Sequence, residues 1–369
     1  MTIRFFLHFV LGTLLLTTGC RKNQDDPTND LFSTYDRRAL LTRIRDRGIG
    51  PAHERLATQA AILDGHTAVL AATPTASALD SVQAAWGRTA RAWKQVEIYA
   101  FGPAEQLNLA ANLGAEANPT LIEGAINSST AIDAAFVAAR PVAARGFWAL
   151  EYLLFSRTTG SAAVLTALTT GPAAGRRRAY VAALAADARQ RATAARDDWK
   201  APTYTAAFVE ADGNDVTSSI SLLANASVQF VETIKNDRLG RPLGDANGGT
   251  AEPTTAEGYR SGTSGALVQA SLDGLRTIWT GTPDARGLNG LLDHLGAQST
   301  GGQALSTIID GQIAAARNLA PADVVSQVDQ SRQPVIDLQN AVKQLTVQLK
   351  TEAVSKLGVL LTFNDNDGD

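Results

Sequence analysis

The segment from Arg145 to Phe155 carries a single carboxylate, Glu151, in an otherwise apolar run. On a helix, Trp148 and Glu151 are three residues apart and share one face. A carboxylate on a buried helix must meet a cation, hydrogen-bond donors or a metal ion, or else take up a proton. Two interpretations stay open: Glu151 is a structural carboxylate paired with an arginine across a helical bundle, or it belongs to a binding site.

A second segment, which ends at Phe101-Gly102-Pro103, carries charges that could complement Glu151. Arg91 and Glu97 lie on a predicted helix that also holds the bulky side chain of Trp86. Arg91 could supply the cation for Glu151, and Glu97 could supply a second carboxylate. The alternative is that both residues form salt bridges at the rim of a bundle, where such pairs contribute little to stability.

The composition restricts the remaining chemistry. The chain has one cysteine, Cys20, and four histidines, of which His8 falls in a predicted signal segment. With Cys20 lipidated, thiolate zinc sites, copper–thioether sites and c-type haem attachment are excluded. No Ser-His-Asp signature or His-Glu-x-x-His motif is present, so we expect a protein that is not an enzyme. The three histidines that remain are His53, His66 and His294.

The first twenty residues predict export and a lipid anchor. Arg4 precedes an apolar run over 5–16, and small residues lead into Cys20. This pattern is typical of a lipoprotein signal peptide, here 1–19, whose removal leaves a lipidated Cys20 as the new amino terminus. Each buried methylene of the acyl chains contributes about 0.8 kcal/mol to membrane binding. We therefore expect a cell-envelope protein on the outer membrane, at its periplasmic face or at the cell surface, with 20–34 as a flexible tether.

The elements that must position these residues are helices. Apolar residues recur at helical spacing, and no strand signal rises above noise. The fold class predicted is all-α, with two helical-bundle halves, 35–160 and 161–369. The net charge of −3 indicates no nucleic-acid partner. The predicted helices cover 35–72, 77–100, 120–139, 142–155, 172–200, 216–235, 263–279, 303–318 and 333–357.

The order and spacing of several short motifs resemble the imelysin family of bacterial envelope proteins. The resemblance covers most of the mature chain. The matching residues are Trp86, Arg91, Trp93, Glu97 and Phe101-Gly102-Pro103, then Gly146-Phe147 and Glu151 to Phe155, then Gly240 to Gly244, Tyr259 to Gly262, Leu275 to Gly281 and the tail from Leu357.

This resemblance implies two bundle-like halves with a site in the cleft between them, and a link to iron uptake. The family signature is Gly-x-His-x-x-Glu, which Gly146 and Glu151 match. Trp148 stands at the histidine position, and its indole has no lone pair for a metal. Glu151 is therefore the only metal ligand that the motif suggests, and iron is the metal that the resemblance implies.

Taken together, the residues and the resemblance predict a non-enzymatic binding component of iron acquisition with a degenerate motif. The expected partners are the membrane, through the lipid on Cys20, and an iron-uptake transporter or an iron species. Two alternatives stay open: a metal-dependent peptidase of the imelysin type, which Trp148 disfavours, and a structural surface lipoprotein. The expected ligand-binding residues are Gly146, Trp148, Glu151, Arg91, Glu97 and Trp86.

Overall fold

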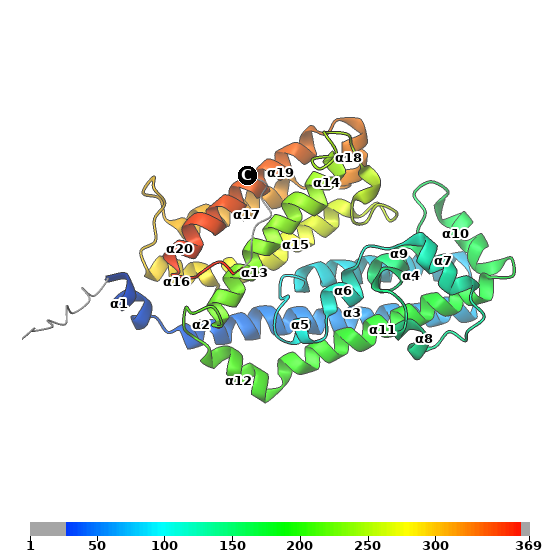
Figure 1. Cartoon of the computed structure of the whole chain (residues 1–369), viewed down its shortest axis with the longest axis horizontal. Coiled ribbons are helices and arrows are strands. Elements are labelled where there is room, and N and C mark those ends of the chain that lie inside the picture. Colours follow the sequence, from blue (N-terminus) through cyan, green and yellow to red (C-terminus); the bar gives the residue numbers. More distant parts are fainter. Residues whose placement is uncertain (1–26, 363–369) are drawn as a thin grey trace, which may run out of the picture.

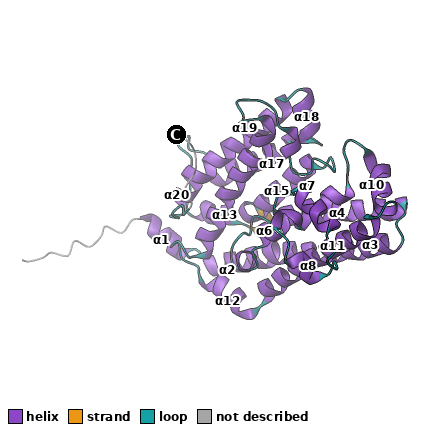
Figure 2. Ribbon diagram, turned by 45° about the vertical axis from the view of Figure 1, so that its right-hand side comes forward, coloured by secondary structure: helices purple, strands orange, loops and turns teal. Residues whose placement is uncertain are grey.

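The computed structural model describes residues 27–362, and their regular secondary structure is almost entirely helical (Figure 2). This confirms the all-α fold. The elements up to Glu210 are α1 (Pro27–Thr34), α2 (Arg37–Arg43), the π-helix η1 (Ile44–Ile49), α3 (Gly50–Ala72), α4 (Ala76–Val96), α5 (Pro103–Gln106), α6 (Leu109–Gly114), α7 (Pro119–Asn127), α8 (Ala134–Ala138), the 3-10 helix η2 (Val142–Ala144), α9 (Gly146–Leu154), α10 (Gly160–Thr169), α11 (Ala174–Lys200) and α12 (Pro202–Glu210).

The remaining elements form the second part of the molecule. A short antiparallel hairpin, β1 with β2, is the only paired sheet within 27–362. The elements are α13 (Ser219–Thr233), the π-helix η3 (Ile234–Gly240), α14 (Arg241–Leu243), the 3-10 helix η4 (Pro253–Thr255), α15 (Ser264–Trp279), β1 (Gly281–Thr282), β2 (Ala285–Arg286), α16 (Leu288–His294), α17 (Leu305–Leu319), α18 (Val324–Gln330), α19 (Gln333–Val347), the π-helix η5 (Gln348–Ala353) and α20 (Val354–Lys356).

The helices form two groups that meet along α4 and α15. In Figure 1, α3, α4 and α11 lie in the lower group, and α13, α15, α17 and α19 lie in the upper group. α11 packs along α3 and against α9, and α10 packs on α11 and α4. The expected boundary after residue 160 therefore assigns α10 and α11 to the second half, although both helices pack on the first group.

The local sequence explains how α4 is formed and oriented. Its N-cap, Thr75, accepts a hydrogen bond from the Ala78 N–H. Such a cap satisfies one of the free donors of the first turn. Leu79, Val82 and Trp86 recur at helical spacing and are buried, which turns this face of α4 towards the core. Arg88 and Arg91 lie on the exposed face.

Two expectations about helix continuity need correction. The predicted helix over 120–139 is two helices, α7 and α8, because Asp133 caps the N–H of Phe136 and so begins a new helix. The run Gly48-Ile49-Gly50-Pro51 predicts an interruption of the helix over 35–72, but the π-helix η1 joins α2 to α3 there. Extra residues in a π-turn keep the chain helical while they change which face a side chain occupies.

The expected flexible tether over 20–34 is helical from Pro27 onward, as α1. The end of α1 is fixed by His294, whose Nε2 lies 3.1 Å from both the Thr34 hydroxyl and the Leu31 carbonyl oxygen. The predicted signal peptide and Cys20 lie outside the described residues.

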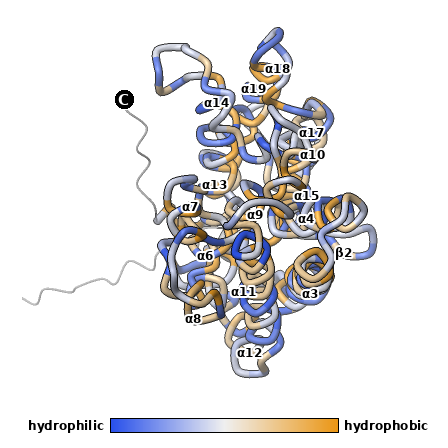
Figure 3. The backbone as a smooth tube through the Cα atoms, turned by 90° about the vertical axis from the view of Figure 1, so that its right-hand side faces the viewer, coloured by the Kyte–Doolittle hydropathy of each residue, from blue (hydrophilic) through white to orange (hydrophobic). Residues whose placement is uncertain are grey.

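Hydropathy along the chain agrees with a protein built from amphipathic helices. Hydrophobic and hydrophilic stretches alternate along the helices, whereas the loop beside α18 is hydrophilic (Figure 3). Within the described part of the chain, none of the helices combines the length and the apolar character that crossing a membrane requires.

Candidate functional site

Glu151 lies on α9 and is buried where the two helix groups meet. Its Oε1 accepts hydrogen bonds from the Ser261 N–H at 2.9 Å and from the Ser261 hydroxyl at 2.8 Å. Burial raises the pKa of Glu151, although the hydrogen bonds from Ser261 and the charge of Arg260 act in the opposite direction. The carboxyl group is therefore held by donors from a loop of the second group, between η4 and α15.

Arg91 is not the cation that complements Glu151, so this expectation was wrong. Arg91 is exposed and lies in a separate groove on the outer face of α4. The cation whose charge lowers the pKa of Glu151 is Arg260. Its guanidinium lies 5.2 Å from the centre of the Tyr152 ring. Ser261 and Arg260 both belong to the segment Tyr259–Gly262. The sequence matched this segment to the imelysin motifs but gave it no functional role.

Trp148 packs against α4 and the end of α6 and is nearly inaccessible to solvent. Its indole N–H donates to the Gly114 carbonyl oxygen at 2.9 Å, and its ring meets Trp86 edge to face at 6.0 Å. The Lys94 ammonium lies 5.0 Å from the centre of the same ring, a cation–π contact. Where the family signature has an imidazole, this chain therefore has a ring that packs against a buried cation.

Gly146 and Trp86 hold α9 in place. Gly146 begins α9 with a φ of +77°, and a Cβ there would lie 2.6 Å from the Leu113 carbonyl oxygen. Only glycine combines that backbone conformation with so close an approach. Trp86 is fully buried on α4, and its indole N–H donates to the Phe147 carbonyl oxygen at 2.9 Å. Both residues thus position Trp148 and Glu151, and neither is free to bind a ligand.

Glu97 belongs to a four-residue ion-pair network with Lys94, Arg238 and Glu257. Lys94 Nζ lies 2.9 Å from Glu97 and 2.7 Å from Glu257. Arg238 lies 2.6 Å from Glu97 and 3.2 Å from Glu257. Each cation therefore contacts both carboxylates. Because Lys94 and the α4 C-cap residue Glu97 belong to the first group, and the other two members belong to the second, the network joins the halves of the molecule.

Burial and geometry fix the charge state of this network. Lys94 is completely buried and Arg238 is nearly so. Burial alone would raise the pKa of Glu97, but Arg238 and Lys94 outweigh it and lower the pKa below its usual value. The π-helix η3 carries Arg238, and the Ser271 hydroxyl on α15 accepts a further hydrogen bond from it at 2.6 Å. Two positive and two negative charges therefore balance within the network.

Sequence reasoning missed Lys94, Arg238 and Glu257. Lys94 lies inside the motif around Glu97. A lysine between Trp93 and Val96 on an apolar helix face could have indicated a buried ion pair. Arg238 and Glu257 had no local signal, because they reach Glu97 and Lys94 from more than 140 residues away along the chain.

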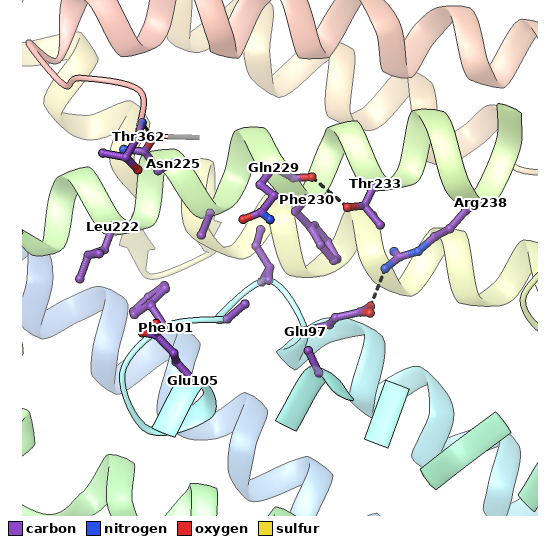
Figure 4. A pocket seen from close by; sticks show the side chains of 14 residues that line it. Glu97, Phe101, Glu105, Leu222, Asn225, Gln229, Phe230, Thr233, Arg238 and Thr362 are labelled. Carbon is purple, nitrogen blue, oxygen red and sulfur yellow. Dashed lines mark hydrogen bonds and ion pairs between the residues drawn. The ribbon is translucent and has the colours of Figure 1, made fainter. Parts of the chain in front are cut away.

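Beside this network lies a cavity of about 360 Å³, which we call the central cavity. Figure 4 shows α13 along one side, with Phe101 and Glu105 facing it from the other side and the Glu97–Arg238 pair at one end. The wall is mixed: Phe230 and Phe101 are apolar, whereas Gln229 presents an amide. Asn225 on α13 binds the last described segment by accepting a hydrogen bond from the Thr362 N–H at 2.9 Å.

The donor set does not fit a metal ion. Within residues 27–362, no three histidine, cysteine or carboxylate side chains gather closely enough to hold one. Glu151 already accepts two hydrogen bonds, and Trp148 offers no lone pair. Glu97 and Glu257 each face two cations, which a metal ion would have to displace.

The three histidines among the described residues lie apart from this site. His53 is buried against Tyr99 and Trp199, and burial lowers its pKa to about 4. His66 is half-buried on α3, and His294 is exposed and bonded to α1. None of the three replaces the imidazole that the signature would have supplied.

Comparisons with known proteins agree with this architecture. The imelysin family model (peptidase family M75) matches residues 49–353. An imelysin-like protein from Psychrobacter arcticum has a similar structure, with a TM-score of 0.72 and 18% identity over 89% of this chain and 97% of its own. A candidate iron-regulated protein A precursor from Parabacteroides distasonis gives 0.70 and 16% over 87% and 95%. No curated protein matches the sequence. Since the family model covers well over half of the sequence, the chain belongs to the imelysin family.

Proposed function

We propose that this protein is a non-enzymatic binding component of iron acquisition in the bacterial cell envelope, and that its ligand occupies the central cavity. The observation that carries the proposal is that Glu97 and Arg238, which line the cavity, already neutralise each other within the ion-pair network. The cavity volume falls in the range of small-molecule sites, which are mostly apolar with a few polar groups. We infer an organic ligand, such as an iron complex with an organic chelator, rather than a bare metal ion.

The polar groups around the cavity suit recognition better than catalysis. A hydrolase needs an activated nucleophile or a metal-bound water. The Ser261 hydroxyl donates to a buried carboxyl and has no histidine beside it among the described residues. Glu97 and Arg238 are held rigidly by the ion-pair network, so they can orient a polar group of the ligand without reorganising. We therefore place metal-dependent peptidase activity second.

The place of the protein in the cell is part of the proposal. The lipid on Cys20 holds it on the outer membrane, at the periplasmic face or at the cell surface, where an iron-uptake transporter is the expected partner. Similarity to an iron-regulated protein supports the link to iron. Replacing Cys20 with alanine should move the protein from the membrane fraction to the soluble fraction. If that variant stays in the membrane fraction, the anchor is wrong.

The cavity is tested by titrating the full-length chain with ferric iron in three forms: a catecholate complex, a hydroxamate complex and ferric nitrilotriacetate. Tryptophan fluorescence reports binding. Ala226→Phe fills the cavity, because Ala226 lines it from α13, and Ala61→Phe is the matched control on an exposed position of α3. We expect one organic complex to bind, with the affinity reduced at least about tenfold in Ala226→Phe only, because the added ring excludes the ligand.

The same titration separates the alternatives. If none of the three forms binds, or if Ala226→Phe binds as well as the unmodified chain, the cavity is not the site and the structural lipoprotein becomes the better interpretation. Cleavage of a broad peptide library that is lost on chelation would instead favour the peptidase.

A further inference from the structure

The outer face of α4 carries a second concave feature, which we call the arginine groove. It lies between α3 and α4 on one side and α15 with α17 on the other, and its volume is about 420 Å³. It shares no lining residue with the central cavity. Its charged residues are Arg55, Arg88, Arg91, Arg317 and Asp273.

Most of the positive charge in this groove is unpaired. Among the described residues, Arg55, Arg88 and Arg91 have no carboxylate within ion-pair distance; Arg88 donates only to the Gln59 side chain, at 3.3 Å. The one carboxylate, Asp273, is occupied by Arg317 at 2.7 Å. Four arginines and one aspartate leave an excess of three positive charges in one groove, on a chain whose net charge is −3.

Helical spacing brings these guanidinium groups together. Arg88 and Arg91 are three residues apart on α4, so they share a face. Gln59 contacts Arg88 from α3, and Arg55 lies one turn away from Gln59 on the same helix. Each guanidinium offers five N–H donors in a planar fork that matches the oxygens of a phosphate or carboxylate group. The side-chain amides of Gln95 and Gln269 add further donors to the walls.

The groove is concave because small residues line it between the arginines. Ala92, Ala266 and Ala270 line it where larger side chains would fill it. At one end the helices nearly touch: a Cβ on Gly274 of α15 would lie 2.9 Å from the Gln95 carbonyl oxygen of α4. The arginine side chains therefore line a concave surface and are not spread over a flat one.

From these observations we propose that the arginine groove binds a small multivalent oxyanion, one that carries two or more phosphate or carboxylate groups. Like charges held on three neighbouring side chains repel one another, and a bound polyanion relieves that repulsion while it forms paired hydrogen bonds. Several arginines around one space favour a ligand with several anionic groups over a single monovalent ion. The proposal does not depend on what occupies the central cavity.

Calorimetry on the full-length chain tests this with pyrophosphate and citrate as probes and acetate as the monovalent comparison, all at constant ionic strength. We expect saturable binding of at least one probe. A second titration series with added chloride should show weaker binding, because the charges are exposed. The double variant Arg88→Gln/Arg91→Gln should lower the affinity at least about tenfold, and Arg91→Lys should lower it by less, because lysine keeps the charge but loses the planar fork.

The matched control is Arg38→Gln/Arg47→Gln, which removes the same charge from two exposed arginines outside the groove. It should bind the probe within about twofold of the unmodified chain, because distant exposed charges are largely screened. Binding of pyrophosphate alone or of citrate alone would support the proposal and name the ligand class. Absence of saturable binding at millimolar probe, or equal loss in the control, would overturn it. Ala226→Phe should leave this binding unchanged, which separates the groove from the central cavity.

Discussion

Replacing Lys94 with methionine should destabilise the protein by about 3 kcal/mol, mostly by removing charge from the ion-pair network. Methionine keeps most of the length of the lysine stem, so packing against Trp148 changes little. The ammonium contacts Glu97 at 2.9 Å and Glu257 at 2.7 Å, and without it Arg238 alone faces both carboxylates. The network then carries a net charge of −1 in a buried place.

The magnitude follows from burial. Removing one partner of a fully buried ion pair costs roughly 3–5 kcal/mol, because the other charge is left without compensation. Lys94 is completely buried, but the side chains of Glu97 and Glu257 are 18% and 26% exposed, so water can solvate part of the leftover charge. That places the expected loss at the lower end of the range. Loss of the contact with the Trp148 ring, roughly 0.5–2 kcal/mol, is included in that figure.

Urea unfolding followed by circular dichroism measures this loss. The double variant Lys94→Met/Glu257→Gln restores neutrality, since Arg238 then faces Glu97 alone, and should recover part of the loss. Lys343→Met, at an exposed position on α19, is the control and should change stability by less than about 0.5 kcal/mol. The reasoning is refuted if Lys94→Met unfolds at the same urea concentration as the unmodified protein, or if the double variant is no more stable than the single one.

Three further results are expected. Gly146→Ala should cost about 3 kcal/mol or more in urea unfolding, because alanine meets both a positive φ and the Leu113 carbonyl oxygen; an unchanged midpoint would contradict this. Because burial raises the pKa of Glu151 above 4.5, its charged form makes the folded state less stable as pH rises through that pKa; Glu151→Gln should flatten this decline, and an unaltered pH profile would count against it. Because the pKa of His53 falls from 6.5 to about 4, its contribution is present above pH 6.5 and declines by up to about 3 kcal/mol as pH drops through 4; His53→Leu should remove this acid slope, and a slope that persists would show another group causes it.

The sequence predicted the parts of the site that depend on local pattern. Glu151 was expected to be buried and to need donors or a cation, and the spacing of Gly146, Trp148 and Glu151 on one helix is as predicted. The assignment of Arg91 failed because five residues separate it from Trp86. At about 100° per residue this puts Arg91 roughly 140° around α4 from the buried face.

What the sequence could not predict depends on contacts between distant segments. Ser261 reaches Glu151 across 110 residues, and Arg238 reaches Glu97 across 141. Helical periodicity says which face of one helix is apolar, but it does not say which loop or helix will cover that face. The break between α7 and α8 was missed for another reason: the carboxylate of Asp133 binds the backbone and competes with helix continuation.

The place where α1 begins has a mechanical consequence for a lipidated chain. α1 lies at one tip of the long axis, and α10 lies at the opposite tip (Figure 1). Residues 21–26 separate Cys20 from Pro27, and even fully extended they reach only about 25 Å. In the proposed lipidated form, this short connection would keep the α1 tip next to the bilayer. The α10 tip would then be the part of the molecule farthest from the membrane surface.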